Sequence, residues 1–387
     1  MDLTRLAARK VVACRSLLTP AGTGAAALAA RCIHAEAKIA AGWRAPSADL
    51  AGASALHAQH RHCCRAGRCA VHRRNVTTTA ADGFKRGYGS AAGHDAHEET
   101  RCVVPLNCYK IPAKQPPSSG GAQAARAPTP MIMIHGLLAS SGTYRSTLKR
   151  PEFASTRDVY ALDMRNHGGS PQVAEMSYEA MVRDVEEFMD SEGIPRAIVM
   201  GHSMGGKVSS MLALEHPERV AGLVLVDIVP KLYDTTPLSK VTQAIALVDL
   251  EACKSRADVE ASLEAHGVVD PSTRSFILTN LVSDGSRPGF YEWRVNIPVI
   301  NDAIKTLMDF PKSVAEKQYT GPTLVIRGQT SDYVQDSDLP LLQKYFPRYR
   351  MHSVKNAAHW VANDNMEGFI DAVNGFLQGA EEAPASE

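Results

Sequence analysis

The sequence lacks a long hydrophobic run, although 44% of its 387 residues are hydrophobic. A helix that spans a membrane needs about 18 or more apolar residues in succession, and the richest stretches here, such as residues 220–226, are short. Short apolar stretches are typical of strands in a protein core. We therefore expect a protein without a transmembrane segment.

An excess of charge of either sign is missing as well. The chain has 42 Lys and Arg residues against 41 Asp and Glu residues, which gives a formal net charge of +1. This balance gives no reason to expect nucleic acid or an anionic surface as the main partner. There is no internal repeat and no dinucleotide-binding fingerprint, so we expect no cofactor. The length suits one large or two ordinary domains.

Acidic side chains are few in the first 80 residues, where three Asp or Glu residues stand against twelve Lys or Arg residues. Leu3 and Leu6 can share a helical face opposite Arg5 and Arg9. A basic, amphipathic, acid-poor segment is typical of an organelle transit peptide, whereas a secretory signal needs a continuous apolar region. We predict a transit peptide and disordered linker over residues 1–99, with a mitochondrial location. A plastid location, or a leader that is merely disordered, is the alternative.

Cysteine is scarce outside that leader. Five of the eight cysteines lie in it, which leaves Cys102, Cys108 and Cys253 in the predicted folded part, too few for a disulfide framework. Cysteine and histidine crowd together over residues 57–72, and they are the usual ligands of zinc. Because their spacing matches no ordered zinc module, we predict no metal site.

Between residues 100 and 380, short apolar segments alternate with segments of helical periodicity. The expected strands are residues 103–111, 131–134, 158–162, 197–200, 223–227, 323–326 and 351–354, and expected helices include residues 178–191 and 368–377. This alternation predicts an α/β protein with a mostly parallel central sheet and helices on both faces. Residues 231–311 interrupt it and indicate a helical lid insertion. A disordered tail is expected at residues 381–387.

One short motif gives the strongest indication of chemistry. Ser203 lies between an expected strand and a helical segment, with Gly201 and Gly205 two positions to either side. This pattern is typical of a nucleophile elbow, a turn too tight for flanking side chains that leaves the serine hydroxyl accessible. The motif therefore predicts nucleophilic catalysis by Ser203.

A serine needs a base to take its proton, and His359 is the best candidate because it follows the last expected strand. The histidine in turn needs an acid that fixes its tautomer. Asp227 and Asp332 each lie at or after the end of an expected strand, and both give the order Ser, Asp, His along the chain. The residues alone leave the choice between the two aspartates open.

The tetrahedral intermediate of acyl transfer carries an oxyanion that backbone N–H groups stabilise. We expect one donor from Met204, directly after the nucleophile, and one from Leu137, in the loop after the strand at residues 131–134. Only the amides of these residues matter, so their apolar side chains are compatible with the role.

Residues 163–170 form the other dense polar motif. We interpret it as a turn held by a network between Asp163 and Arg165 rather than as a catalytic element. Asn166 suits such a turn, because asparagine is one of the few residues besides glycine that readily adopts the left-handed conformation.

Together these segments resemble an alpha/beta-hydrolase, and most closely the esterase group that includes alpha/beta-hydrolase domain-containing protein 11 and its bacterial esterase relatives. The resemblance covers about residues 130–377, within a catalytic domain expected at residues 100–380. The matching stretches are residues 135–137, 163–171, 201–207, 226–228, 293–296 and 356–360. The loop at residues 112–130 is longer than the family pattern.

The resemblance implies a triad of Ser203, Asp227 and His359, because the position of Asp332 is usually not acidic in the group; this chain departs from the pattern there. It implies a serine hydrolase that cleaves carboxylic esters or thioesters of small to medium acyl chains through an acyl-enzyme. A lyase or a cofactor-free peroxidase on the same fold is one alternative. A non-catalytic binding or chaperone-like protein, with a protein partner in an organelle complex, is the other.

Overall fold

The computed structural model describes residues 102–114 and 128–381, so residues 1–99 and all but the first residue of the predicted tail lie outside the described residues. The strands are β1 Cys108–Ile111, β2 Met131–Ile134, β3 Val159–Leu162, β4 Ala197–His202, β5 Val220–Val226, β6 Leu281–Ser283, β7 Tyr291–Trp293, β8 Thr323–Gly328 and β9 Tyr349–Val354. The α-helices are α2 Arg145–Lys149, α3 Tyr178–Ser191, α4 Met204–Glu215, α5 Thr236–Ala246, α6 Arg256–Ala265, α7 Pro271–Ile277, α8 Ile297–Met308, α9 Leu339–Tyr345, α10 Val361–Asp364 and α11 Met366–Glu381. None of the helices in these ranges is long and apolar enough to cross a membrane.

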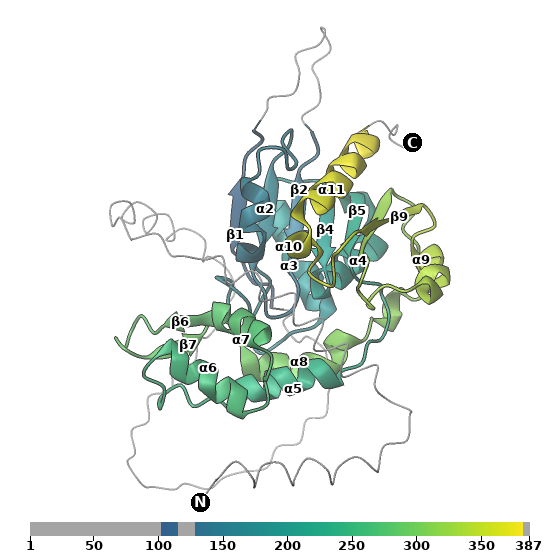
Figure 1. Ribbon diagram of the computed structural model, residues 1–387. Helices are drawn as coiled ribbons and strands as arrows, with labels where there is room; N and C mark the ends of the chain where they lie inside the picture. Colours follow the sequence, from purple (N-terminus) through teal and green to yellow (C-terminus); the bar gives the residue numbers. More distant parts are fainter. Residues whose placement is uncertain (1–101, 115–127, 382–387) are drawn as a thin grey trace, which may run out of the picture. The chain divides into compact units, whose positions relative to one another are not determined.

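Seven strands form the central sheet, in the order β1-β3-β2-β4-β5-β8-β9 (Figure 1). All neighbours pair in parallel except β1, which is antiparallel to β3. The first strand is shorter than expected, because the backbone N–H groups before it are not available for strand pairing. Val104 N–H donates to the Asp184 side chain, and Asn107 N–H donates to Ser170 Oγ. Pro105 has no N–H to donate. The predicted mostly parallel sheet is confirmed.

Alternate residues of the strands pack into two hydrophobic cores, one on each face of the sheet. In β2, Ile132 and Ile134 belong to the core that contains buried residues of α3 and α4. Met131 and Met133 belong to the other core, together with Phe369 of α11 and a buried leucine of α2. Helices therefore cover both faces, which leaves the ends of the strands as the place for polar residues.

The segment between β5 and β8 contains α5 to α8, which Figure 1 shows gathered in one group beside the sheet-bearing part. Four α-helices thus lie in the segment where we expect a helical insertion, residues 231–311. It also contains an antiparallel hairpin of β6 and β7 that the sequence did not reveal. Each of these strands has three residues, too few for an alternating pattern to be recognised.

Lys207, on α4, forms hydrogen bonds to the C-terminal end of α8, the last helix of this lid. Its buried ammonium donates to the carbonyl oxygens of Met308 and Asp309 at 2.8 and 2.9 Å, and to Leu307 O at 3.4 Å. Carbonyls at the C-terminal end of a helix have no partner within it, and a cation is favourable there. Burial nevertheless lowers the pKa of Lys207 to about 7. The end of α8 is thus held by the helix that follows Ser203.

We expect Lys207→Ala to lower the free energy of unfolding by about 2–5 kcal/mol, because it removes a buried side chain and leaves Asp309 O without a donor among the described residues. Urea denaturation followed by circular dichroism measures the change. Lys240→Ala, at an exposed position on α5, is the matched control and should shift stability by less than about 0.5 kcal/mol. Equal stabilities of the two variants would contradict the role given to Lys207.

Candidate active site

Ser203 occupies a sharp turn between β4 and α4. Its backbone has φ 51° and ψ −117°, a conformation that costs a side-chain-bearing residue of the order of 1–3 kcal/mol. The flanking glycines are required sterically, because a Cβ on Gly201 would collide with Gly205 O and a Cβ on Gly205 with Ile134 O. Ser203 itself is partly exposed. The sequence motif therefore folds into the tight strand-to-helix turn that an elbow requires.

Asp227 directly follows β5, and its carboxylate is fully buried. Three donors reach it: the backbone N–H of Gly328 at 3.0 Å, the hydroxyl of Ser331, and Nδ1 of His359 at 2.8 Å. A carboxylate only accepts hydrogen bonds, so the proton lies on His359 Nδ1 and leaves Nε2 as an acceptor. The structure thus brings together one of the two candidate acids and the candidate base.

His359 also lies next to the turn that holds Ser203. Nε2 of His202 donates to the carbonyl oxygen of His359 at 2.9 Å, and the two ring centroids are 4.6 Å apart. Burial lowers the pKa of His202 well below its usual value, so its ring is neutral. Within the described residues no hydrogen bond joins Ser203 Oγ to the His359 ring; such bonds are often long until substrate binds.

Asp332, the alternative acid, is exposed, and among the described residues its carboxylate makes no hydrogen bond or ion pair with His359. Its two neighbours turn toward the buried pair instead. Ser331 donates to Asp227, and the ring of Tyr333 stacks on His359 with centroids 3.7 Å apart. Sequence reasoning missed both residues. Their only signal was their place beside Asp332, after a predicted strand.

The two expected oxyanion donors, Met204 and Leu137, belong to segments that lie next to the serine. Met204 is the first residue of α4, where N–H groups have no partner within the helix and carry partial positive charge. The loop that contains Leu137 approaches closely, because a Cβ on Gly136 would be 3.4 Å from Cβ of Ser203. Within the described part of the chain, neither the Leu137 nor the Met204 N–H donates a hydrogen bond. Both amides are therefore free to bind an oxyanion.

The direction of the Leu137 N–H is fixed through the carbonyl of its own peptide group. Gly136 O accepts from His135 Nδ1 at 2.7 Å and from Ala139 N at 3.2 Å. The N–H of a trans peptide points away from its C=O, so both bonds also orient Leu137 N–H. His135 Nε2 accepts from Met164 N at 3.0 Å, which places the ring proton on Nδ1.

His167 supports the next peptide group of this loop. Leu138 has φ 60°, which is uncommon for a residue with a side chain. Its N–H donates to His167 Nε2 at 3.1 Å, and His167 Nδ1 donates to Arg165 O at 3.0 Å. Burial lowers the pKa of His167 to about 3, so the ring is neutral and Nε2 can accept. Apart from the dense polar motif at residues 163–170, no pattern in the sequence indicated this role.

The expected network between Asp163 and Arg165 is wrong. Asp163 accepts from the N–H of Gly169, at 2.8 Å, and so holds the turn without the arginine. Arg165 instead pairs with Asp184 of α3 at 2.6 and 2.8 Å. Asp184 is fully buried, and removing its partner would leave an uncompensated charge in the core. Asn166, with φ 66°, adopts the expected left-handed conformation.

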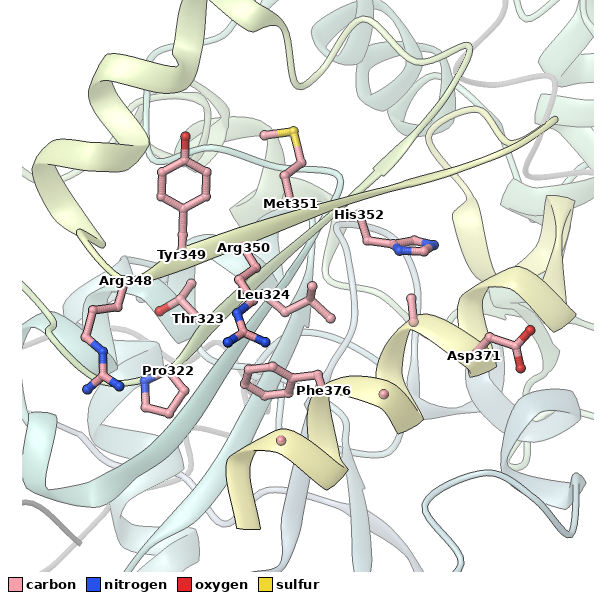
Figure 2. A pocket seen from close by; sticks show the side chains of 13 residues that line it. Pro322, Thr323, Leu324, Arg348, Tyr349, Arg350, Met351, His352, Asp371 and Phe376 are labelled. Atoms are coloured by element: carbon pink, nitrogen blue, oxygen red, sulfur yellow. The ribbon is translucent and has the colours of Figure 1, made fainter. Parts of the chain in front are cut away.

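A cavity of about 620 Å³ lies elsewhere, along β9 and α11. Figure 2 shows Arg350 and His352 of β9, Arg348 just before it, and Phe376 of α11 around the cavity. Ser203, Asp227 and His359 do not line this cavity. It is therefore separate from the serine, histidine and aspartate that the strand ends bring together.

Acid should destabilise the protein through His167. The pKa of its ring is about 3 in the folded protein and about 6.5 in an unfolded chain. Between these values the unfolded chain binds a proton that the folded chain does not, so stability falls as the pH falls through this window. His167→Gln keeps an acceptor for Leu138 N–H but does not titrate. As the pH is lowered through this window, we expect the free energy of unfolding of His167→Gln to fall less steeply than that of the wild type. Urea titrations at several pH values measure this dependence.

The exposed His266 provides the matched control, His266→Gln. This variant should follow the wild-type dependence on pH. An unchanged slope in His167→Gln would show that the buried ring of His167 does not contribute to acid sensitivity.

The sequence matches the family described as alpha/beta hydrolase fold over residues 129–365. The sn-1-specific diacylglycerol lipase ABHD11 of Mus musculus is 36% identical over 253 residues, 64% of this chain and 80% of the lipase. Esterase YbfF of Escherichia coli is 30% identical over 260 residues, 66% of this chain and 96% of the esterase. A solved marine microorganism esterase has a TM-score of 0.63 and 30% identity, and covers 71% of this chain and 100% of its own. The chain therefore belongs to the alpha/beta-hydrolase family, in the esterase group that its sequence resembles.

Proposed function

We propose that the protein is a serine hydrolase that cleaves carboxylic esters or thioesters of small to medium acyl chains. The observation that carries the proposal is the hydrogen bond from His359 Nδ1 to the buried carboxylate of Asp227, beside a serine in a strained elbow. Ester hydrolysis is also the class of reaction that membership of the esterase group supports. His202, the histidine next to Ser203, has no hydrogen bond to a carboxylate among the described residues.

In the proposed mechanism, His359 Nε2 takes the hydroxyl proton of Ser203 while Oγ bonds to the acyl carbon. The carbonyl electrons move to the oxygen, which the Leu137 and Met204 amides stabilise. As the intermediate collapses, the bond to the leaving alcohol or thiol breaks, and His359 returns the proton to that group. Water then attacks the acyl-enzyme in the same way and releases the acid. Asp227 keeps the ring in the required tautomer and stabilises the imidazolium.

The lid helices α5 to α8 are proposed to select the acyl chain. A series of p-nitrophenyl esters of increasing chain length measures this preference directly. The mouse relative is named a diacylglycerol lipase, so a diacylglycerol belongs in the same series.

Two alternatives would give different results. A lyase or a cofactor-free peroxidase on this fold would react with a fluorophosphonate but would hydrolyse none of the p-nitrophenyl esters. A non-catalytic binding or chaperone-like protein of an organelle complex would not react with the probe when folded. Mitochondrial delivery by residues 1–99 also remains our proposal, supported by their basic, acid-poor composition.

Ser203→Ala and His359→Ala should each lower kcat on p-nitrophenyl acetate by about 10⁴-fold or more, because nucleophile and base act as one unit. Fluorophosphonate labelling should vanish in Ser203→Ala. Ser210→Ala is the matched control on the same helix, since the Ser210 hydroxyl bonds only within α4, to Gly206 O. Retained turnover in Ser203→Ala would rule out the proposed acyl-enzyme.

A comparison of Asp227→Asn with Asp332→Asn identifies the acid. Asp227→Asn should lower kcat by about 10⁴-fold, because an amide in contact with His359 favours the wrong tautomer. The kcat of Asp332→Asn should stay close to that of the wild type, because the Asp332 side chain is exposed. Steady-state kinetics on the same ester measures both, and a larger loss in Asp332→Asn would give the acid role to Asp332.

A further inference from the structure

One residue of the lid contacts the loop that carries Leu137. Asn280 ends the short helical turn Leu278–Asn280 between α7 and β6, and it is 4% exposed. Its side-chain Nδ2 donates to the carbonyl oxygen of Leu138 at 2.8 Å. Its own carbonyl accepts from Arg294 N at 2.8 Å, beside the end of β7. The backbone of Asn280 is thus bonded within the lid, while its side chain bonds to the loop that carries Leu137.

Two rigid peptide groups connect this contact to the oxyanion donor. The Leu138 carbonyl shares its peptide plane with Ala139 N–H, so the bond from Asn280 also orients that N–H. Ala139 N–H donates to Gly136 O at 3.2 Å. The Gly136 carbonyl shares its peptide plane with Leu137 N–H. The hydrogen bond from Ala139 N–H to Gly136 O therefore also helps to set the direction of Leu137 N–H. Asn280 therefore lies two hydrogen bonds away from a group that should bind the oxyanion.

The other supports of this loop come from the core. His135 holds Gly136 O, and His167 holds Leu138 N–H. His135 directly follows β2, and His167 lies in the turn after β3. A left-handed leucine such as Leu138 persists only where its surroundings hold it in place. Among the described residues, the bond from Asn280 is the direct hydrogen bond from the lid insertion to residues 136–139.

We propose that Asn280 is a positioning residue that fixes the Leu137 N–H through Leu138, so that the oxyanion hole is complete only when the lid is in place. The inference rests on the proposed hydrolysis and adds a role for the lid in the chemical step. A second contact from the same part of the lid supports it, because Phe276 of α7 packs against Trp360, the residue after His359, with ring centroids 5.3 Å apart. The lid thus touches both sides of the site.

Asn280→Leu, which keeps a side chain of similar size but removes the donor, tests the proposal. Removal of an oxyanion donor itself typically costs about 10²- to 10³-fold in kcat. His135 still holds Gly136 O in this variant, so we expect a smaller loss, of about 10- to 100-fold on p-nitrophenyl acetate, with KM nearly unchanged. Affinity for a trifluoromethyl ketone, whose adduct places an oxyanion in the hole, should fall by the same factor as kcat/KM.

Thr279→Val is the matched control, because the Thr279 hydroxyl bonds to Phe276 O within the lid and not to the loop. Rates are expressed per site labelled to completion by a fluorophosphonate, so unfolded protein does not count. Asn280→Asp keeps the shape of the side chain, and at a pH where its carboxylate is ionised it has no donor for the Leu138 carbonyl, so its loss there should at least equal that of Asn280→Leu. Hydrogen exchange should accelerate over residues 136–139 in both Asn280 variants and not in Thr279→Val.

Turnover, ketone affinity and hydrogen exchange that match Thr279→Val in both Asn280 variants would overturn the proposal. A wild-type protein that neither turns over the ester nor reacts with the fluorophosphonate would instead refute the proposed hydrolysis. In that event faster exchange over residues 136–139 would still show that Asn280 holds the loop. The two failures are therefore distinguishable.

Discussion

Parallel pairing of β4, β5, β8 and β9 is the constraint on which the site depends. Val226 of β5 lies opposite His202 of β4 and Ile326 of β8, so the carboxyl ends of these strands meet at one edge of the sheet. Ser203 and Asp227 directly follow their strands, and the loop with the histidine follows β9. Residues more than a hundred positions apart therefore converge without long connections, and the contact of aspartate and imidazole is a consequence of strand register.

Convergence of this kind requires the chain to turn sharply as each strand ends. Leu138, Ser203 and Asp227 all have positive φ, at 60°, 51° and 51°, and such conformations cost of the order of 1–3 kcal/mol each for residues other than glycine. At all three positions a fixed acceptor holds the backbone N–H. The acceptors are, in order, His167 Nε2, Val226 O and Ile326 O. Part of the backbone strain therefore lies where function is proposed, and the sheet and the ring of His167 hold it there.

Much of this arrangement could be predicted because its signals are local. A few adjacent residues suffice to recognise the elbow glycines, the apolar strands and the helix Tyr178–Ser191. Asp184, Asn280 and Ser331 could not be found in that way, because each acts on a residue far away in the chain and no spacing rule links them. The same limit explains the error at Arg165, which pairs across to α3 and not with its close neighbour Asp163.

The contacts of the lid with the core bear on how such an enzyme would select substrates. A cover that only excluded water would need an apolar underside and no directed polar bonds. This lid instead accepts from Lys207 on the helix after Ser203 and donates through Asn280 to Leu138 O, in the loop that carries Leu137. Because both bonds depend on distance and angle, an acyl chain that displaces the lid would disturb the groups that stabilise charge in the transition state. Discrimination among acyl chains should therefore enter the chemical step as well as binding.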